Sequence, residues 1–129
     1  MRAFGWAIGL SLLVAAQATA AENRFERSLQ MLAPAERLEQ LCDYTAMARI
    51  RKDAGNFQPD RAVANATAEP VITNDTIDTA GGAFRSRGKW YALAFTCKAT
   101  PDHMAVVSFN YKIGPEIPEG KWVSDGASD

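Results

Sequence analysis

Apolar residues in the first half of the chain recur at the spacing of an α-helix. Phe25, Leu29 and Leu32 stand at positions i, i+4 and i+7, which predicts a short amphipathic helix ending near residue 32. A second, longer helix is predicted over residues 34–53, because Pro34 suits the first turn of a helix. The apolar face of the longer helix comprises Leu38, Leu41, Cys42 and Thr45.

The hydrophobic period changes from helical to alternating in the second half of the chain. Residues 90–98 and 104–113 alternate between apolar and polar positions and predict two β-strands, and residues 62–68 predict a weaker one. Ser86–Lys89 predicts a tight hairpin loop, with Gly88 at the position that needs a positive φ. This order indicates an α+β fold, with two N-terminal helices packed on an antiparallel β-meander of three to five strands.

Glycine and proline predict where regular structure is interrupted. Residues 57–60, Phe-Gln-Pro-Asp, predict a turn. Gly81–Gly82 predicts another turn, and Gly114 with Pro115 predicts the end of the last strand.

The N-terminus has the pattern of a secretory signal peptide, with Arg2, an apolar run over residues 3–16, and the small-x-small sequence Ala18-Thr19-Ala20. The run is shorter than the roughly twenty residues that span a bilayer. We therefore expect residues 1–20 to be cleaved. A single α+β domain over residues 21–122 and a disordered tail over residues 123–129 should remain.

The two cysteines lie at positions where the predicted elements should meet. Cys42 is on the apolar face of the long helix, and Cys97 is on the apolar face of the longest strand. A redox-active pair would be closer in sequence, and a metal site would need more ligands. Because export leads to an oxidising compartment, we expect a structural disulfide between helix and sheet.

Composition excludes some partners. Fourteen basic residues are balanced by fifteen acidic ones, which argues against binding to nucleic acid or to an anionic membrane surface. No second apolar segment approaches spanning length, so we expect no membrane span after cleavage. The sequence assigns no catalytic residue, metal ligand or cofactor, and the only histidine, His103, is expected to be a solvated turn residue.

One group of residues stands out as a candidate binding site, at the predicted hairpin. Basic side chains next to aromatic ones can bind a carboxylate, a phosphate or an acidic glycan. The alternative is a solvated loop whose tryptophan packs on a helix. The candidate residues are Arg85, Arg87, Lys89, Trp90 and Tyr91.

Several segments together resemble a family of small exported alphaproteobacterial proteins known only as a domain of unknown function. They include residues 38–42, 46–52, 57–61, 82–85 and 89–91, Phe95-Thr96-Cys97, Ile113-Gly114, Ile117-Pro118 and Trp122. The resemblance covers nearly the whole chain after residue 20. It implies a bacterial envelope setting and paired cysteines, and it transfers no catalytic residue.

These observations favour a non-catalytic binding or interaction module of the cell envelope, periplasmic or secreted, whose partner is an unknown envelope protein or glycan. Available aromatic anchors are Trp90, Tyr91, Phe109 and Tyr111. Two alternatives stay open. One is a small envelope-acting enzyme, a hydrolase or isomerase, and the other is a secreted hydrolase inhibitor that presents the Ser86–Lys89 loop.

Overall fold

The computed structural model describes residues 23–121, so the predicted signal peptide and C-terminal tail lie outside the described residues. A helical segment over residues 23–30 precedes one long helix, five strands and a short 3-10 helix. In chain order these are α2 (Pro34–Asp53), β1 (Pro59–Val63), β2 (Val71–Thr73), β3 (Thr76–Ser86), β4 (Lys89–Ala99), β5 (Val106–Glu116) and η1 (Glu119–Lys121).

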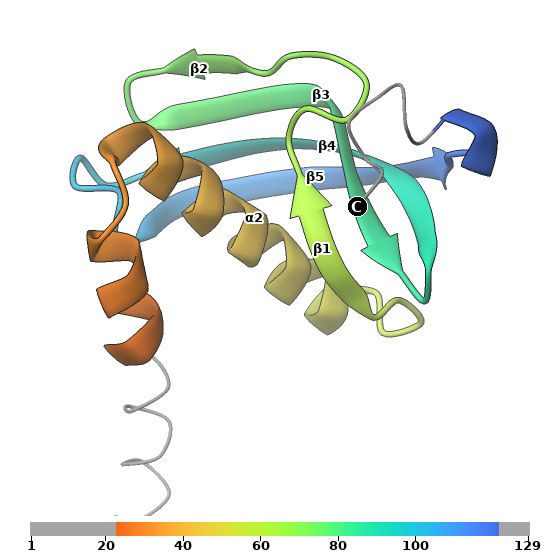
Figure 1. Ribbon diagram of the computed structural model, residues 1–129, viewed down its shortest axis with the longest axis horizontal. Helices are drawn as coiled ribbons and strands as arrows, with labels where there is room; N and C mark the ends of the chain where they lie inside the picture. Colours follow the sequence, from red (N-terminus) through yellow and green to blue (C-terminus); the bar gives the residue numbers. More distant parts are fainter. Residues whose placement is uncertain (1–22, 122–129) are drawn as a thin grey trace, which may run out of the picture.

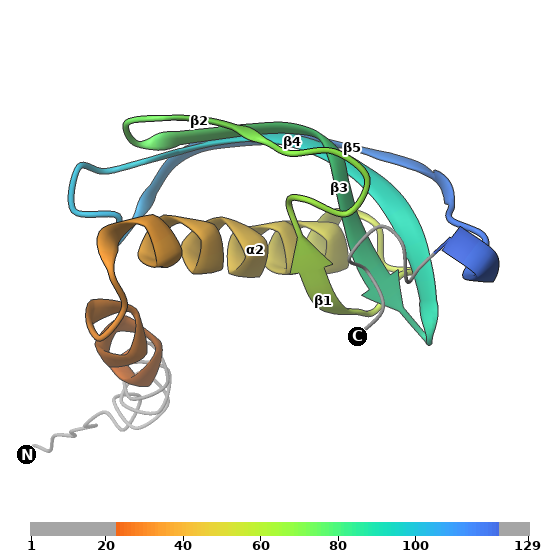
Figure 2. The same ribbon diagram turned by 45° about the horizontal axis from the view of Figure 1, so that its top comes forward.

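The five strands form one antiparallel sheet in the order β1-β3-β4-β5, with β2 also paired to β3. β1 pairs with residues 83–86 of β3 and β2 pairs with residues 76–78, so both short strands share one edge of β3. The sheet curves over α2, which covers one of its faces (Figures 1 and 2). The predicted α+β fold of helices on an antiparallel sheet is confirmed.

Helix α2 occupies the residues that the sequence predicts. Pro34 lies at its start, Glu36 lies in the positively polarised first turn, and Arg51 and Lys52 lie in the last turn. Each of these residues stabilises the end of the helix at which it lies. The buried face toward the sheet consists of Leu38, Leu41, Cys42, Ala46 and Ile50.

Arg37 of α2 joins the first helical segment to the rest of the molecule. Its Nε donates to the carbonyl oxygen of Leu29 at 3.0 Å, and one terminal nitrogen donates to that of Leu32 at 3.0 Å. The other terminal nitrogen donates to the Asp102 carbonyl at 2.9 Å. Carbonyls at a helix C-terminus lack partners within the helix, so this guanidinium satisfies them and fixes the first segment against α2.

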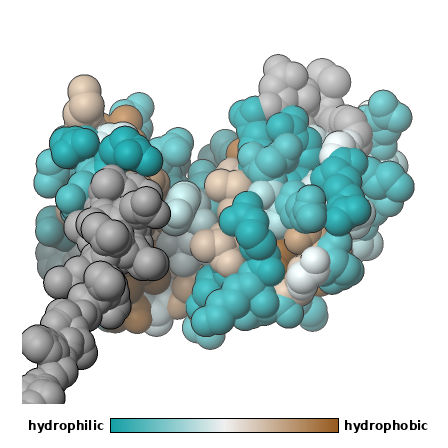
Figure 3. Space-filling view, turned by 90° about the horizontal axis from the view of Figure 1, so that it is seen from below, coloured by the Kyte–Doolittle hydropathy of each residue, from teal (hydrophilic) through white to brown (hydrophobic). Residues whose placement is uncertain are grey.

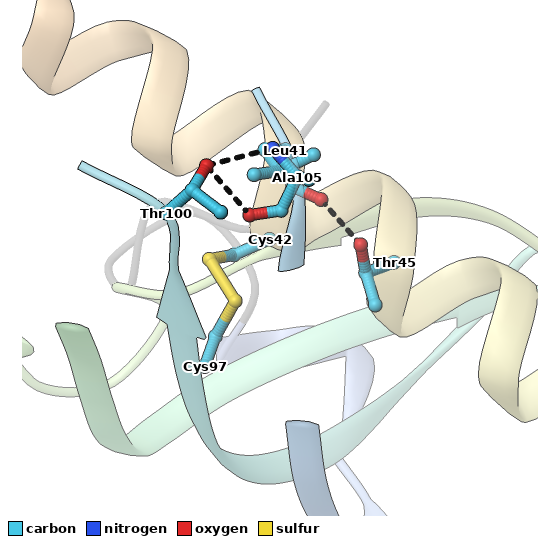
Figure 4. Close-up of a disulfide and its surroundings, with 6 residues drawn as sticks. All are labelled: Leu41, Cys42, Thr45, Cys97, Thr100 and Ala105. Atoms are coloured by element: carbon cyan, nitrogen blue, oxygen red, sulfur yellow. Dashed lines mark hydrogen bonds between the residues drawn. A yellow bond between two sulfur atoms is a disulfide. The ribbon is translucent and has the colours of Figure 1, made fainter. Parts of the chain in front are cut away.

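The hydrophobic core lies between α2 and the sheet, and a disulfide crosses it. Leu93, Phe95 and Cys97 of β4 are buried in this core, as their alternation predicts. Cys42 on α2 is bonded to Cys97, with their Cα atoms 6.0 Å apart (Figure 4). The predicted disulfide is therefore confirmed.

The turn predicted at Gly81–Gly82 is wrong, because β3 continues through both residues. Between Thr79 and Gly82, β3 has one residue more than the facing part of β4, which is a β-bulge. A Cβ atom on Gly82 would lie only 2.8 Å from the Val63 carbonyl oxygen and 2.9 Å from that of Leu93. Glycine therefore allows β3 to fit between β1 and β4 at this point.

Two further predicted boundaries are also wrong. β1 begins at Pro59, inside the predicted turn, and β5 continues through Gly114 and Pro115. Both strands lie at the ends of the sheet order, where a proline is tolerated because its missing N–H need not pair. Gly114 and Pro115 lie opposite Ala92 in a second bulge. The weak strand predicted over residues 62–68 overlaps only the end of β1.

Candidate functional site

Two adjoining pockets lie between α2 and β1, and together we call them the α2–β1 groove. Their volumes are about 350 Å³ and about 270 Å³. Gln40, Asp43 and Val63 line both pockets, so the pockets meet at the middle of α2. The larger pocket is also lined by Phe25, Tyr44, Met47, Asp60, Arg61 and Ala62. The smaller pocket is also lined by Glu39, Ala64, Asn65, Glu69, Pro70 and Ile72.

Asp43 is the central polar residue of the α2–β1 groove. Its Oδ1 atom is buried and has no hydrogen-bond partner among the described residues. Burial, with a smaller contribution from the negative charge of Glu39, raises the pKa of the Asp43 carboxyl from its ordinary value of 3.8 to about 7, although Arg61 opposes this effect. At neutral pH the carboxyl can therefore either donate or accept a proton, a property found more often at functional sites than elsewhere.

Aromatic side chains form one wall of the groove. Phe25 from the first helical segment stacks on Tyr44 of α2 with ring centroids 4.3 Å apart. Tyr44 nevertheless remains 51% exposed. The pair therefore presents an accessible apolar surface next to the Asp43 carboxyl, a combination common in ligand sites.

The predicted hairpin site adjoins this groove through one ion pair. Arg85 Nε lies 2.9 Å from Asp60 Oδ1, and Asp60 lines the larger pocket. The Arg85 guanidinium also lies 5.8 Å from the ring centroid of Trp90. Arg87 and Lys89 are exposed at the turn. Of the three basic residues, Arg85 is thus connected to the groove through Asp60, and the role of the three in binding an anion stays a prediction.

The two hairpin aromatics are used in packing. Trp90 is only 1% exposed and lies in a small second core with Ala66, Ala83 and Ile117, not against a helix. Tyr91 packs against the ring of Phe57 with centroids 5.0 Å apart and also against that of Phe84. Neither ring is left as an exposed platform on the hairpin.

The hairpin turn itself has the geometry that the sequence predicts. Ser86 pairs with Lys89, and the two residues between them have positive φ values, 52° for Arg87 and 78° for Gly88. Positive φ at both central positions is characteristic of a type I′ turn, which matches the twist of the flanking strands.

His103 is not the solvated turn residue that we expected, because it is only 8% exposed. Its Nδ1 lies 2.8 Å from the carbonyl oxygen of Pro34, and its Nε2 lies 2.9 Å from Asp75 Oδ1. Both partner atoms are oxygens at hydrogen-bond distance from a ring nitrogen, so both nitrogens of the ring are held within the fold. His103 therefore fastens the β4–β5 connection to the start of α2 and to the β2–β3 turn. The sequence could not indicate this, since both partners are distant along the chain.

A third depression, of about 360 Å³, lies on the sheet face away from α2. Asp78 is its carboxylate, and Thr96 Oγ1 already donates a hydrogen bond to Asp78 Oδ1 at 3.2 Å. Because the Asp78 carboxylate has a partner, whereas Asp43 Oδ1 has none among the residues that the structure describes, we place the candidate site in the α2–β1 groove.

The described part of the chain contains no group of three or more histidine, cysteine or acidic residues that could hold a metal ion. No helix within residues 23–121 is long and apolar enough to cross a membrane. Figure 3 shows hydrophilic side chains over most of one face, with apolar residues between them.

Sequence reasoning missed the groove because Asp43 lies outside the apolar face that periodicity predicts for α2. The residues Gln40, Asp43, Tyr44 and Met47 follow the helical spacing of three and four, and so form a stripe beside the apolar face. This stripe of one amide, one acid, one aromatic residue and one methionine was the available signal.

Comparisons with known proteins identify the family and nothing more specific. No curated protein and no solved structure matches the chain. The family model described as Domain of Unknown Function (DUF930) matches residues 29–126, which include nearly all the described elements and both cysteines. The chain therefore belongs to the DUF930 family.

Proposed function

We propose that this protein is an exported, non-catalytic binding or interaction module of the bacterial cell envelope, and that it holds an envelope protein or glycan in the α2–β1 groove. The observation that carries the proposal is the Asp43 carboxyl, which has a buried oxygen without a partner among residues 23–121 and lies where two pockets meet. A buried polar atom without a partner destabilises the fold, so its retention is explained if a ligand supplies the partner.

Two features support an envelope location, periplasmic or secreted. Residues 1–20 have the pattern of a secretory signal peptide. The disulfide between Cys42 and Cys97 is of the kind that persists in oxidising compartments. The resemblance to exported alphaproteobacterial proteins agrees with both. Fractionation of a bacterium expressing the full chain tests the proposal, since recovery of the protein with an intact leader in the cytoplasm would contradict it.

The contacts of His103, which is the only histidine in the sequence, favour binding over catalysis. Both ring nitrogens of His103 face acceptors within the fold, so neither is available to a substrate. The residues around Asp43 provide hydrogen-bonding groups and apolar surface, which suit recognition.

One observation favours a second candidate function, an enzyme of the hydrolase or isomerase class. A carboxyl whose pKa is about 7 is suited to general acid–base catalysis at neutral pH. Turnover of an envelope component that is abolished by Asp43→Asn would support the enzyme over the binding module.

Site-specific photocrosslinking in living bacteria tests the binding function. Tyr44→p-benzoylphenylalanine places a photoreactive group at the groove, and Asn110→p-benzoylphenylalanine places the same group on the opposite face of the sheet. We expect a discrete adduct from position 44 that is absent from position 110 and weakened by Asp43→Asn. Equal adducts from both positions, or none from position 44, would contradict a ligand in the groove.

A further inference from the structure

The charges that line the α2–β1 groove are mostly of one sign. The smaller pocket is lined by Glu39, Asp43 and Glu69, and its described lining includes no lysine or arginine. Arg61 and Asp60 line the larger pocket, and Asp60 is already paired with Arg85. Within residues 23–121, a positively charged group from outside the chain would therefore find the Asp43 oxygen without a hydrogen-bond partner, with acidic residues around it and Arg61 as the basic residue of the lining.

The groove also runs along the free edge of a strand. β1 is the outermost strand and pairs with β3 on one side only. Four consecutive residues of β1, Asp60 to Val63, line the larger pocket. Since consecutive side chains of a strand point to opposite faces, a pocket that touches all four lies along the strand edge. An edge next to a helix can accept an extended segment of a partner.

Apolar side chains lie beside the acidic centre. Met47 and the stacked rings of Phe25 and Tyr44 line the same pocket as Asp43. Long basic side chains bury their aliphatic stems against such surfaces while the charged end pairs elsewhere. The groove thus offers separate contacts to the stem and to the charge of one basic residue.

We propose that the α2–β1 groove binds an extended, basic segment of a protein partner, with a lysine or arginine side chain paired to Asp43 and the segment lying along β1. This inference rests on the proposed function and chooses the protein partner over the glycan. The choice follows from charge complementarity, because a neutral glycan brings no positive charge to the acidic residues of the groove.

Fluorescence anisotropy with synthetic probes tests the inference on the full mature chain. The probes are a labelled peptide of alternating lysine and valine, its counterpart with glutamate in place of lysine, and a labelled oligomer of N-acetylglucosamine. Asp43→Asn removes the central charge. Asp78→Asn is the matched control, because it removes the same charge from the opposite face of the sheet.

We expect the lysine peptide to bind and the glutamate peptide to bind at least 10-fold more weakly. Asp43→Asn should weaken binding of the lysine peptide by about 10-fold or more, since loss of one partner from a buried charge pair has effects of this order. Asp78→Asn should change it by less than about 2-fold. Circular dichroism should show that both variants are folded.

Each contrary result has a distinct meaning. Binding of the glutamate peptide as tight as that of the lysine peptide, or lysine-peptide binding insensitive to Asp43→Asn, overturns the basic-segment inference. Binding of the oligosaccharide alone, weakened by Asp43→Asn, overturns the inference and leaves the proposed binding module standing. Absence of binding by all three probes, together with no crosslink at position 44, overturns both.

Discussion

Helix α2 has two flanks with different contacts. We call the flank that faces β4 and β5 the anchored flank, and the flank that faces β1 the open flank. On the flank facing β4 and β5, Cys42 is bonded to Cys97, and Arg49 donates a hydrogen bond to the Phe109 carbonyl at 3.3 Å. On the flank facing β1, Asp43 has a buried oxygen without a partner in the described part of the chain and borders two pockets. The first flank satisfies its polar groups and stabilises the fold. The second leaves a polar group unsatisfied, which is the arrangement expected of a surface that functions by binding.

The largest effect should come from removing the covalent link of the anchored flank. Cys42→Ser combined with Cys97→Ser opens a loop with a sequence separation of 55 residues. The chain-entropy estimate for such a loop is a loss of about 4 kcal/mol in the free energy of unfolding. Urea denaturation of wild type and double variant measures it. Equal midpoints would show that packing alone holds α2 to the sheet.

On the open flank, removing the Asp43 carboxyl should instead raise the free energy of unfolding at neutral and higher pH. The pKa of Asp43 is raised from 3.8 to about 7 in the folded protein, so its protonated form favours folding. That contribution is complete below about pH 3.8 and is lost as the pH rises to about 7, by on the order of 4 kcal/mol in total.

Asp43→Asn removes this ionisation, so the variant should be the more stable protein at pH 8 and should differ little at pH 4. Urea denaturation across this range, compared with Asp78→Asn, isolates the effect from that of other carboxyls. A wild type and an Asp43→Asn variant with parallel pH profiles would mean that the carboxyl is well solvated.

Next in size is the attachment of the β4–β5 connection to the start of α2. His103→Asn should lose contacts with the Pro34 carbonyl and with Asp75, at a cost of about 2 kcal/mol. Asparagine is chosen because His103 has a φ of 59°, which asparagine tolerates. Faster amide hydrogen exchange in residues 100–105 should accompany the loss. Unchanged exchange there would show that the histidine does not hold the connection.

The smallest effect is expected at the end of the anchored flank. The Tyr111 hydroxyl donates a hydrogen bond to Asp53 Oδ2 at 2.9 Å, close to Arg49. Tyr111→Phe keeps the ring and removes this bond, which should cost roughly 0.5–1 kcal/mol. Thermal unfolding of this variant is compared with that of Tyr44→Phe, whose side chain lines the larger pocket on the open flank. A larger loss of stability from Tyr44→Phe than from Tyr111→Phe would contradict the view that the anchored flank contributes more to stability.

Sequence periodicity predicted what depends on local spacing. The bounds of α2, the alternation in β4 and the meeting of Cys42 with Cys97 all follow from patterns within single elements. The bulges at Gly81–Gly82 and Gly114–Pro115 could not be predicted in this way, because the same residues favour turns when no partner strand is known.

The candidate site escaped prediction for a related reason. Asp43 resembles any acid on the polar side of a helix until β1 is placed beside it. The buried state of His103 likewise depends on Pro34 and Asp75, which are brought to it only by the fold. The environments of both residues depend on burial and on contacts with distant segments, and the local sequence pattern predicts neither.

The adjacency of Cys42 and Asp43 along α2 connects maturation of the protein to its groove. Successive residues of an α-helix point about 100° apart, so the residue bonded to β4 is followed by one turned toward β1. In the newly made, reduced chain no covalent bond fixes the distance from this part of α2 to the sheet. Oxidation of the two thiols therefore also restrains the position of the groove's carboxyl relative to the sheet, so we expect binding in the groove to depend on the disulfide.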